Sequence, residues 1–362
     1  METPTQTPTQ TRMRALAVRR RPGVGELAGC LESIEVPIPE PGPKEVRVRV
    51  CACSINIDDQ HLAERTMLGG LPIGPKPTEQ RPYVPGADLA GVVEAVGGRV
   101  EGLAVGDAVF GIANPIRGKG AWAQYCCTQG RSLHRVPEGW SLVEAAACGL
   151  SSTVACAAIA GAGPIEGRTC VVVGASGGIG GLLTQILDAA GAEVVGVCSG
   201  RNAELVRALG ARRVLDYTQG AFGDALVADG TEVAYVFDFV GGRDVEAQAR
   251  RILPRSGRFV TIVGPERFVG ETRLGWTRIA RMLGYTLWRM LASRTRGPRY
   301  VFAGPLAPPW AEIERLVLEP EIRPTIDREV TFEVDAVAEA IRYVASHRAR
   351  GKVVIRVADE PG

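Results

Sequence analysis

The stretch TCVVVGASGGIGGLLTQILDAAGAEVVGVCS, residues 169–199, decides the fold of this chain. It opens with Cys170–Val173, a short apolar run typical of a buried parallel strand. A turn of small residues follows at 174–180, and apolar side chains then recur at helical spacing up to Gly191. Glu193–Cys198 is a second apolar strand. The pattern predicts a complete β-turn-α-β unit.

The turn has the composition that a pyrophosphate needs at a helix N-terminus, where free N–H groups and the helix dipole favour an anion. Side chains there would block the approach of the phosphates, and Ala175 is the single departure from three glycines at 175, 177 and 180. The alternative is a parallel α/β unit that binds no nucleotide. We expect dinucleotide contacts from Ala175, Ser176, Gly177, Gly178, Ile179 and Gly180.

The end of the second strand indicates which dinucleotide is bound. NAD-selective folds place an acid there for the ribose 2′-OH, but this chain continues Cys198-Ser199-Gly200-Arg201. A hydroxyl and a guanidinium suit a 2′-phosphate. We therefore predict NADPH rather than NADH. The alternative for Arg201 is a solvated residue at the start of the next helix.

Length and composition limit the class of protein. A chain of 362 residues predicts two domains, and a net charge of +2 gives no indication of nucleic-acid binding. Nine scattered cysteines fit a reducing compartment, and no apolar run is long enough to span a membrane. Residues 1–12 carry a low-complexity repeat without the features of a signal or transit peptide, so we predict a disordered tail and a cytoplasmic protein.

The first 135 residues or so predict a twisted antiparallel barrel, because short strands alternate with turn residues. Leu68–Pro82, rich in Pro and Gly, is expected to be a surface loop. The expected strands are Arg14–Val18, Leu31–Val36, Glu45–Cys51, Gly91–Val96, Asp107–Phe110, Ala121–Cys127 and Leu133–Val136.

From Ser141, which forms a capping box with Glu144, strands and helices alternate as in a doubly wound sheet. Further strands are expected at Arg213–Tyr217, Val233–Phe239, Arg258–Val263 and near Tyr300–Phe302. The chain then returns to the barrel through a strand Thr331–Val334, a helix Ala336–Ser346 capped by Asp335, and a strand Val353–Val357.

A cofactor-binding unit that follows a small barrel in the sequence resembles the medium-chain dehydrogenase/reductase superfamily, and within it the quinone oxidoreductase branch. The resemblance rests on GPKEVRVRVCACSINIDD, VPGADLAGVVEAVG, VGDAVFG, GASGGIG, ELVRALGARRVLDY and HRARGKVVI. It implies an α/β protein with a GroES-like β-barrel catalytic domain at 13–140 and a Rossmann NADPH-binding domain with a doubly wound parallel sheet at 141–305. Residues 306–362 return to the catalytic domain, and a homodimer is expected.

The zinc ligands of the superfamily's alcohol dehydrogenases are missing. Asn56 stands at the cysteine position, and Gly86-Ala87-Asp88 replaces Gly-His-Glu. Cys126 and Cys127 are adjacent in a strand and point to opposite faces, so they do not share a metal easily. We predict no bound metal.

The resemblance assigns further site residues. Asn56 matches the quinone-reductase Asn near the nicotinamide and is our candidate catalytic residue, although Asn and Asp also stabilise turns, the role we favour for Asp59. Thr153 or Ser152 is expected to replace a family Thr at Val154. The implied cofactor contacts are Tyr217 and Lys352 near the 2′-phosphate, with Val240, Val263 and Phe302 near the nicotinamide. Tyr217 has a structural alternative as an ordinary aromatic at a strand end.

Arg267–Arg299 combines an apolar helical face with arginines. Such a helix either lies on a membrane or packs against the domain or a dimer partner, and we favour packing. The apolar face is Ile279, Met282, Leu283, Leu287, Met290 and Leu291, and the arginines are at 273, 278, 281, 289, 294, 296 and 299.

Three functions remain open. The leading hypothesis is an NADPH-dependent, zinc-free reductase of quinones or α,β-unsaturated carbonyl compounds, in which Asn56 polarises the acceptor. The second is a stand-alone enoyl reductase of polyketide or secondary metabolism. The third is a non-enzymatic NADPH-binding protein.

Overall fold

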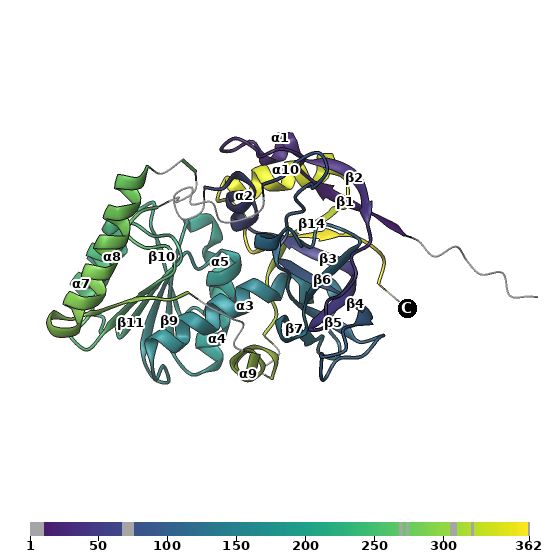
Figure 1. Cartoon of the computed structure of the whole chain (residues 1–362). Helices are drawn as coiled ribbons and strands as arrows, with labels where there is room; N and C mark the ends of the chain where they lie inside the picture. The colour runs from purple at the N-terminus through teal and green to yellow at the C-terminus, as the bar shows by residue number, and fades with distance from the viewer. Residues whose placement is uncertain are drawn as a thin grey trace, which may run out of the picture.

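The computed structural model describes residues 11–66, 76–267, 271–272, 275–304, 310–319 and 322–360. Two large sheets lie side by side, with one long helix, α3 (Leu142–Ala162), between them (Figure 1). Residues 1–10, 67–75 and Arg273 fall outside the described part, and with them the expected tail and most of the expected loop Leu68–Pro82.

The predicted doubly wound sheet is confirmed. Six parallel strands lie in the order β10-β9-β8-β11-β12-β13, so the order reverses between β8 and β11, where ligands bind in such folds. The strands are β8 Thr169–Val173, β9 Glu193–Cys198, β10 Arg213–Asp216, β11 Tyr235–Asp238, β12 Arg258–Thr261 and β13 Arg299–Phe302. The helices are α4 Gly178–Ala189, α5 Ala203–Ala208, α6 Phe222–Ala228, α7 Arg243–Ile252 and α8 Trp276–Arg296.

The second sheet is built on one long central strand, β3, which pairs antiparallel with β4, β6 and β15. Its strands are β3 Glu45–Ile55, β4 Asp88–Val96, β5 Ala108–Ile112, β6 Tyr125–Gln129, β7 Leu133–Arg135, β14 Ile326–Thr331 and β15 Lys352–Arg356. A separate antiparallel pair is β1 Arg12–Ala17 with β2 Glu32–Pro37. The helices on this side are α1 Leu27–Cys30, α2 Ile57–Glu64 and α10 Val334–Ala345. Short helical turns occur at Pro115–Arg117, Gly130–Ser132 and Gly200–Asn202, and α9 (Trp310–Ile313) runs into a π-helical turn, Glu314–Leu318.

The helix α3 begins at the predicted capping box. Glu144 N donates to Ser141 Oγ (3.2 Å), and Ser141 N donates to Glu144 Oε2 (2.9 Å). Within the described residues α3 alone is long and apolar enough to cross a bilayer, and 83% of its most apolar window is buried inside the protein. The helix is therefore the core element on which both sheets pack.

Several expected boundaries are wrong. The strand expected at Thr331–Val334 is β14, which ends at Thr331, and α10 already begins at Val334, so Asp335 lies in its first turn rather than at its cap. The sequence missed the start of this strand, because β14 is an edge strand rich in charged residues and lacks the apolar alternation from which strands are predicted. The expected tail also extends too far, since Arg12 opens β1.

Candidate active site

The glycine-rich turn leaves β8 and enters α4 with the geometry of an anion site. A Cβ at Gly180 would lie 2.2 Å from the carbonyl oxygen of Gly174, so only glycine permits this closure. The helix starts after Gly177 with no side-chain cap and no acid in its first turn. Its first N–H groups therefore remain available to a phosphate, and the residues present fit a dinucleotide.

The ends of β9 and β10 bring together three of the predicted cofactor residues. Ser199 and Arg201 follow β9, and Tyr217 follows β10, where its N–H donates to Cys198 O (3.2 Å). Arg201 and Tyr217 are exposed, which fits both contact with a phosphate and the alternatives given for each residue. Sequence reasoning missed Asn202, a buried residue whose Nδ2 donates to Ser176 Oγ (3.0 Å) and so ties this edge to the glycine-rich turn.

Val240, Val263 and Phe302 form an apolar wall at the ends of β11, β12 and β13. Val240 Cγ2 lies 3.2 Å from the position of a Cβ at Gly174, Val263 contacts Gly241, and Phe302 contacts Gly264. The structure thus brings these predicted residues together, beside the turn.

A buried carboxylate, missed from the sequence, holds this wall in place. Asp238 Oδ1 accepts from the N–H groups of Val240 (3.0 Å) and Gly241 (2.8 Å), and its Oδ2 accepts from Thr261 Oγ1 (2.9 Å). Burial raises the pKa of Asp238, although these hydrogen bonds oppose the rise. Asp238 therefore acts as a structural clamp.

Asn56 belongs to a buried polar cluster contributed by three separate strands and a helix start. Lys352 Nζ donates to Asn56 Oδ1 (2.5 Å) and to Asp88 Oδ2 (2.9 Å). Asp88 Oδ2 also accepts from Asn56 Nδ2 (3.0 Å) and from Ser54 Oγ (2.5 Å). Asp88 and Lys352 are 0% and 5% exposed. The result is an ammonium and an amide presented together at the boundary between the two sheets.

The placement of Lys352 differs from expectation. Its ammonium is bonded to Asn56, which we expect near the nicotinamide, whereas the resemblance implied a place near the 2′-phosphate; that assignment remains a prediction. The Lys352 stem passes the glycine-rich turn, since a Cβ at Gly178 would lie 2.6 Å from Lys352 Cδ. The cluster and the turn are therefore in direct contact.

Asp59 supports the cluster from the first turn of α2. Its Oδ2 accepts from Asn56 N (2.8 Å), the turn-stabilising bond expected of it. The side chain is fully buried, and its Oδ1 has no partner among the described residues. Burial raises the pKa of Asp59 to about 7, and the charge of Asp88 adds to the rise, while the Asn56 hydrogen bond and Lys352 oppose it.

The helix α3 closes the cluster from the other side. Leu150 N donates to Asp88 Oδ1 (2.6 Å), and a Cβ at Gly149 would lie 2.9 Å from the same oxygen. Thr153 Oγ1 and Ser152 Oγ both donate back to Gly149 O (2.9 and 3.1 Å). Their hydroxyls are engaged within α3, whereas Ser151 Oγ is buried without a partner among the described residues.

The donor set does not suit zinc. Within the described residues no group of three or more His, Cys, Asp or Glu side chains is placed to hold a metal ion. At the position of the superfamily's catalytic metal ligands the chain has Asn56, Ala87 and an Asp88 paired with Lys352. A bonded ammonium repels a divalent cation.

Two domain families match this chain. Residues 42–138 match the alcohol dehydrogenase GroES-like domain, and residues 209–355 match the zinc-binding dehydrogenase family. The chain belongs to the medium-chain dehydrogenase/reductase superfamily and, within it, to the quinone oxidoreductase branch. Its two parts are accordingly a GroES-like domain and a Rossmann domain.

Individual relatives agree with this assignment. The mitochondrial NAD(P)H oxidoreductase RTN4IP1 of Mus musculus is 32% identical over 289 residues, which are 77% of this chain and 72% of the relative. The 2-methylene-furan-3-one reductase of Solanum lycopersicum is 30% identical over 282 residues, 76% of this chain and 63% of the relative. The quinone oxidoreductase structure from Coxiella burnetii superposes with a TM-score of 0.74 at 23% identity, covering 96% of this chain and 99% of that one.

Proposed function

We propose that this chain is an NADPH-dependent, zinc-independent reductase of quinones or α,β-unsaturated carbonyl compounds. The observation that carries the proposal is the Lys352 ammonium, held by Asn56 and Asp88 against the glycine-rich turn. The names of the relatives, an NAD(P)H oxidoreductase, a furanone reductase and a quinone oxidoreductase, point to the same class of reaction.

The cofactor, when bound, supplies the hydride. The residues of this chain bind and orient it: the start of α4 takes the pyrophosphate, and the wall of Val240, Val263 and Phe302 borders the nicotinamide. Ser199, Arg201 and Tyr217 bind the 2′-phosphate, which is the basis for preferring NADPH.

The cluster stabilises negative charge on the acceptor oxygen. Asn56 Nδ2 and Lys352 Nζ are preorganised donors, because Asp88 fixes both. They take the role that a Lewis acid plays in the zinc enzymes, and they suit an acceptor that is already electrophilic.

The test is oxidation of NADPH and NADH by chelator-treated protein with 1,4-benzoquinone, 9,10-phenanthrenequinone and crotonyl thioester. We expect turnover of a quinone with NADPH, undiminished by the chelator. Loss of turnover on chelation, restored by Zn²⁺, contradicts the zinc-independent role of Lys352.

A second candidate is a stand-alone enoyl reductase, favoured by one observation. Such an enzyme needs a proton donor in the cleft, and Lys352 is a buried, hydrogen-bonded ammonium beside Asn56. Turnover of the thioester without turnover of quinones selects this candidate. Cofactor binding without turnover of any acceptor selects the binding-protein hypothesis.

Asp59 predicts the pH dependence of the reaction. Below its pKa of about 7 the side chain is neutral, and above it a second negative charge opposes the charge that develops on the acceptor at Asn56. We expect kcat/KM for a quinone to fall several-fold as the pH rises through about 7, and Asp59→Asn to abolish this inflection. The measurement is a pH profile of NADPH oxidation.

The half-exposed neighbour Asp58 provides the control, because Asp58→Asn changes the same net charge in the same helical turn and should keep the inflection. The inflection should move only to a lower pH, since the charge of Asp58 adds to the raised pKa of Asp59. Stability gives an independent readout. Since folding raises the pKa of Asp59 from 3.8, the unfolded chain ionises first, and this group lowers stability between about pH 4 and 7. The fall should be smaller in Asp59→Asn, in which the raised pKa of Asp238 still contributes. An unchanged rate profile in Asp59→Asn contradicts the assignment.

Homodimer formation and a cytoplasmic location remain predictions. All nine cysteines are free thiols and eight of them are buried, which supports a reducing compartment. Light scattering and fractionation of cells test the two predictions.

A further inference from the structure

The helix α8 is attached to its domain by polar side chains. Arg289, 5% exposed, forms an ion pair with the buried Glu246 of α7, and Tyr285 Oη donates to the same carboxylate (2.9 Å). Near the helix end, Ser293 Oγ accepts from Tyr300 N in β13 (3.0 Å). A buried, hydrogen-bonded ion pair fixes the rotation of the helix about its axis. The outward face is therefore determined by the fold.

That outward face is apolar, so most of it does not pack against its own domain, one of the two packing partners expected. Leu283 and Leu287, which belong to the apolar face expected from the sequence, are each 59% exposed, and Ile279 alone of that set is buried. Figure 1 shows α8 on the outside of the Rossmann domain, on the side away from the barrel. The exposed apolar face consists of Trp276, Leu283, Leu287, Trp288, Met290 and Leu291.

The charges around this face have one sign. Residues 276–296 contain five arginines and no acid, and Arg281, Arg294 and Arg296 are exposed. Tryptophan and arginine flanking an apolar stripe are typical of helices that lie in a membrane interface. A symmetric contact with a second copy would set this positive face against itself, which like charges disfavour.

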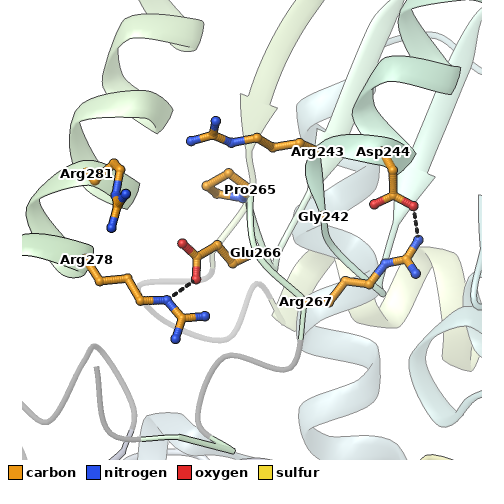
Figure 2. A pocket seen from close by; sticks show the side chains of 8 residues that line it. All are labelled: Gly242, Arg243, Asp244, Pro265, Glu266, Arg267, Arg278 and Arg281. Carbon is orange, nitrogen blue, oxygen red and sulfur yellow. Dashed lines mark hydrogen bonds and ion pairs between the residues drawn. The ribbon is translucent and has the colours of Figure 1, made fainter. Parts of the chain in front are cut away.

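A depression of about 510 Å³ adjoins the N-terminal half of α8 (Figure 2). Two of its four arginines are paired, Arg278 with Glu266 (2.6 Å) and Arg267 with Asp244 (2.5 Å). Arg243 stacks on Tyr285, and among the described residues neither Arg243 nor Arg281 has a carboxylate partner. The depression is lined by Gly242, Arg243, Asp244, Pro265, Glu266, Arg267, Arg278 and Arg281. Its surplus positive charge is complementary to a phosphate headgroup.

We propose that α8 docks this protein on an anionic lipid bilayer. The exposed apolar face enters the boundary between headgroups and acyl chains, while Arg281 and the neighbouring depression meet lipid phosphates. At 21 residues, α8 is about 30 Å long, which is enough for a stable interfacial helix. The proposal is independent of the acceptor that the active site reduces.

The experiment is co-sedimentation of the full chain with vesicles of phosphatidylcholine mixed with phosphatidylglycerol, and with vesicles of phosphatidylcholine alone. We expect binding to the mixed vesicles that weakens with salt. Leu283→Gln/Leu287→Gln should weaken it about tenfold or more, because two exposed leucines no longer enter the bilayer. Arg281→Gln should weaken binding to the mixed vesicles only.

The control is Val227→Gln, which removes a 50% exposed apolar side chain from α6 and should bind like the native protein. NADPH oxidation, or NADPH binding, checks that every variant is folded. Two outcomes overturn the proposal: absence of binding to the mixed vesicles, or a dimer by light scattering that Leu283→Gln/Leu287→Gln converts to a monomer, since a second copy then covers the face.

Discussion

Lys352→Met is expected to lower kcat/KM for a quinone by about a hundredfold to a thousandfold, with NADPH affinity changing far less. The substitution removes one of two preorganised donors at the acceptor oxygen and keeps the apolar stem that passes Gly178. It also leaves Asp88 buried and charged without its partner, which costs about 3–5 kcal/mol of stability. Steady-state kinetics and urea unfolding measure the two effects.

The double variant Lys352→Met/Asp88→Asn separates chemistry from folding. The amide that replaces the Asp88 carboxylate keeps one oxygen as the acceptor for Leu150 N, and its NH2 group can donate to Ser54 Oγ, which then accepts instead of donating. No unpaired charge is left, so part of the lost stability should return. Activity should stay low, since the ammonium is still missing. Recovery of activity in the double variant would falsify the role of Lys352 at the acceptor and leave it a structural ion.

Arg201→Glu is expected to raise the KM for NADPH about a hundredfold and to change the KM for NADH less than about threefold. A charge-assisted bond to the 2′-phosphate is lost, and a repelling carboxylate takes its place beside Ser199 and Tyr217. Fluorescence titration with each cofactor measures its dissociation constant, which should change in the same way as the KM.

The matched control is Arg207→Glu, an exposed arginine of α5 six residues further along the chain. It makes the same change in net charge and should leave both cofactors unaffected. The carboxylate of Asp216 lies against Gly200 at the same sheet edge. Its negative charge repels a phosphate there, so the loss of Arg201 should be felt clearly. An equal loss for NADPH and NADH in Arg201→Glu means that the arginine does not distinguish the 2′-phosphate.

The strands of the parallel sheet, which are apolar because both of their faces are buried, were predictable from the sequence. β9 begins and ends where the apolar run does, and β8 begins one residue before its predicted start. α4 begins at Gly178, inside the predicted turn 174–180. The capping box at Ser141 and Glu144 was local and equally reliable. Such patterns need only near neighbours in the chain.

The features that the sequence could not show depend on distant contacts. Lys352 reaches Asn56 because β15 pairs with β3, a contact between residues about three hundred positions apart that no local pattern encodes. The orientation of α8 depends on Glu246 of another helix, which holds Arg289 inside. Periodicity identified the apolar face of α8 but could not decide what covers it, because periodicity carries no information about the partner.

The position of α3 constrains how the two halves of the protein move. α3 packs against β3, β4, β5 and β15 on one side and against α4 and β12 on the other. Residues 145–162 of this helix are mostly Ala, Gly, Ser and Cys, so its surface is smooth. We therefore expect relative motion of the domains to include a shear along this helix. Because Leu150 N donates to Asp88, which in turn accepts from Lys352, we expect such a shear to shift the Lys352 ammonium.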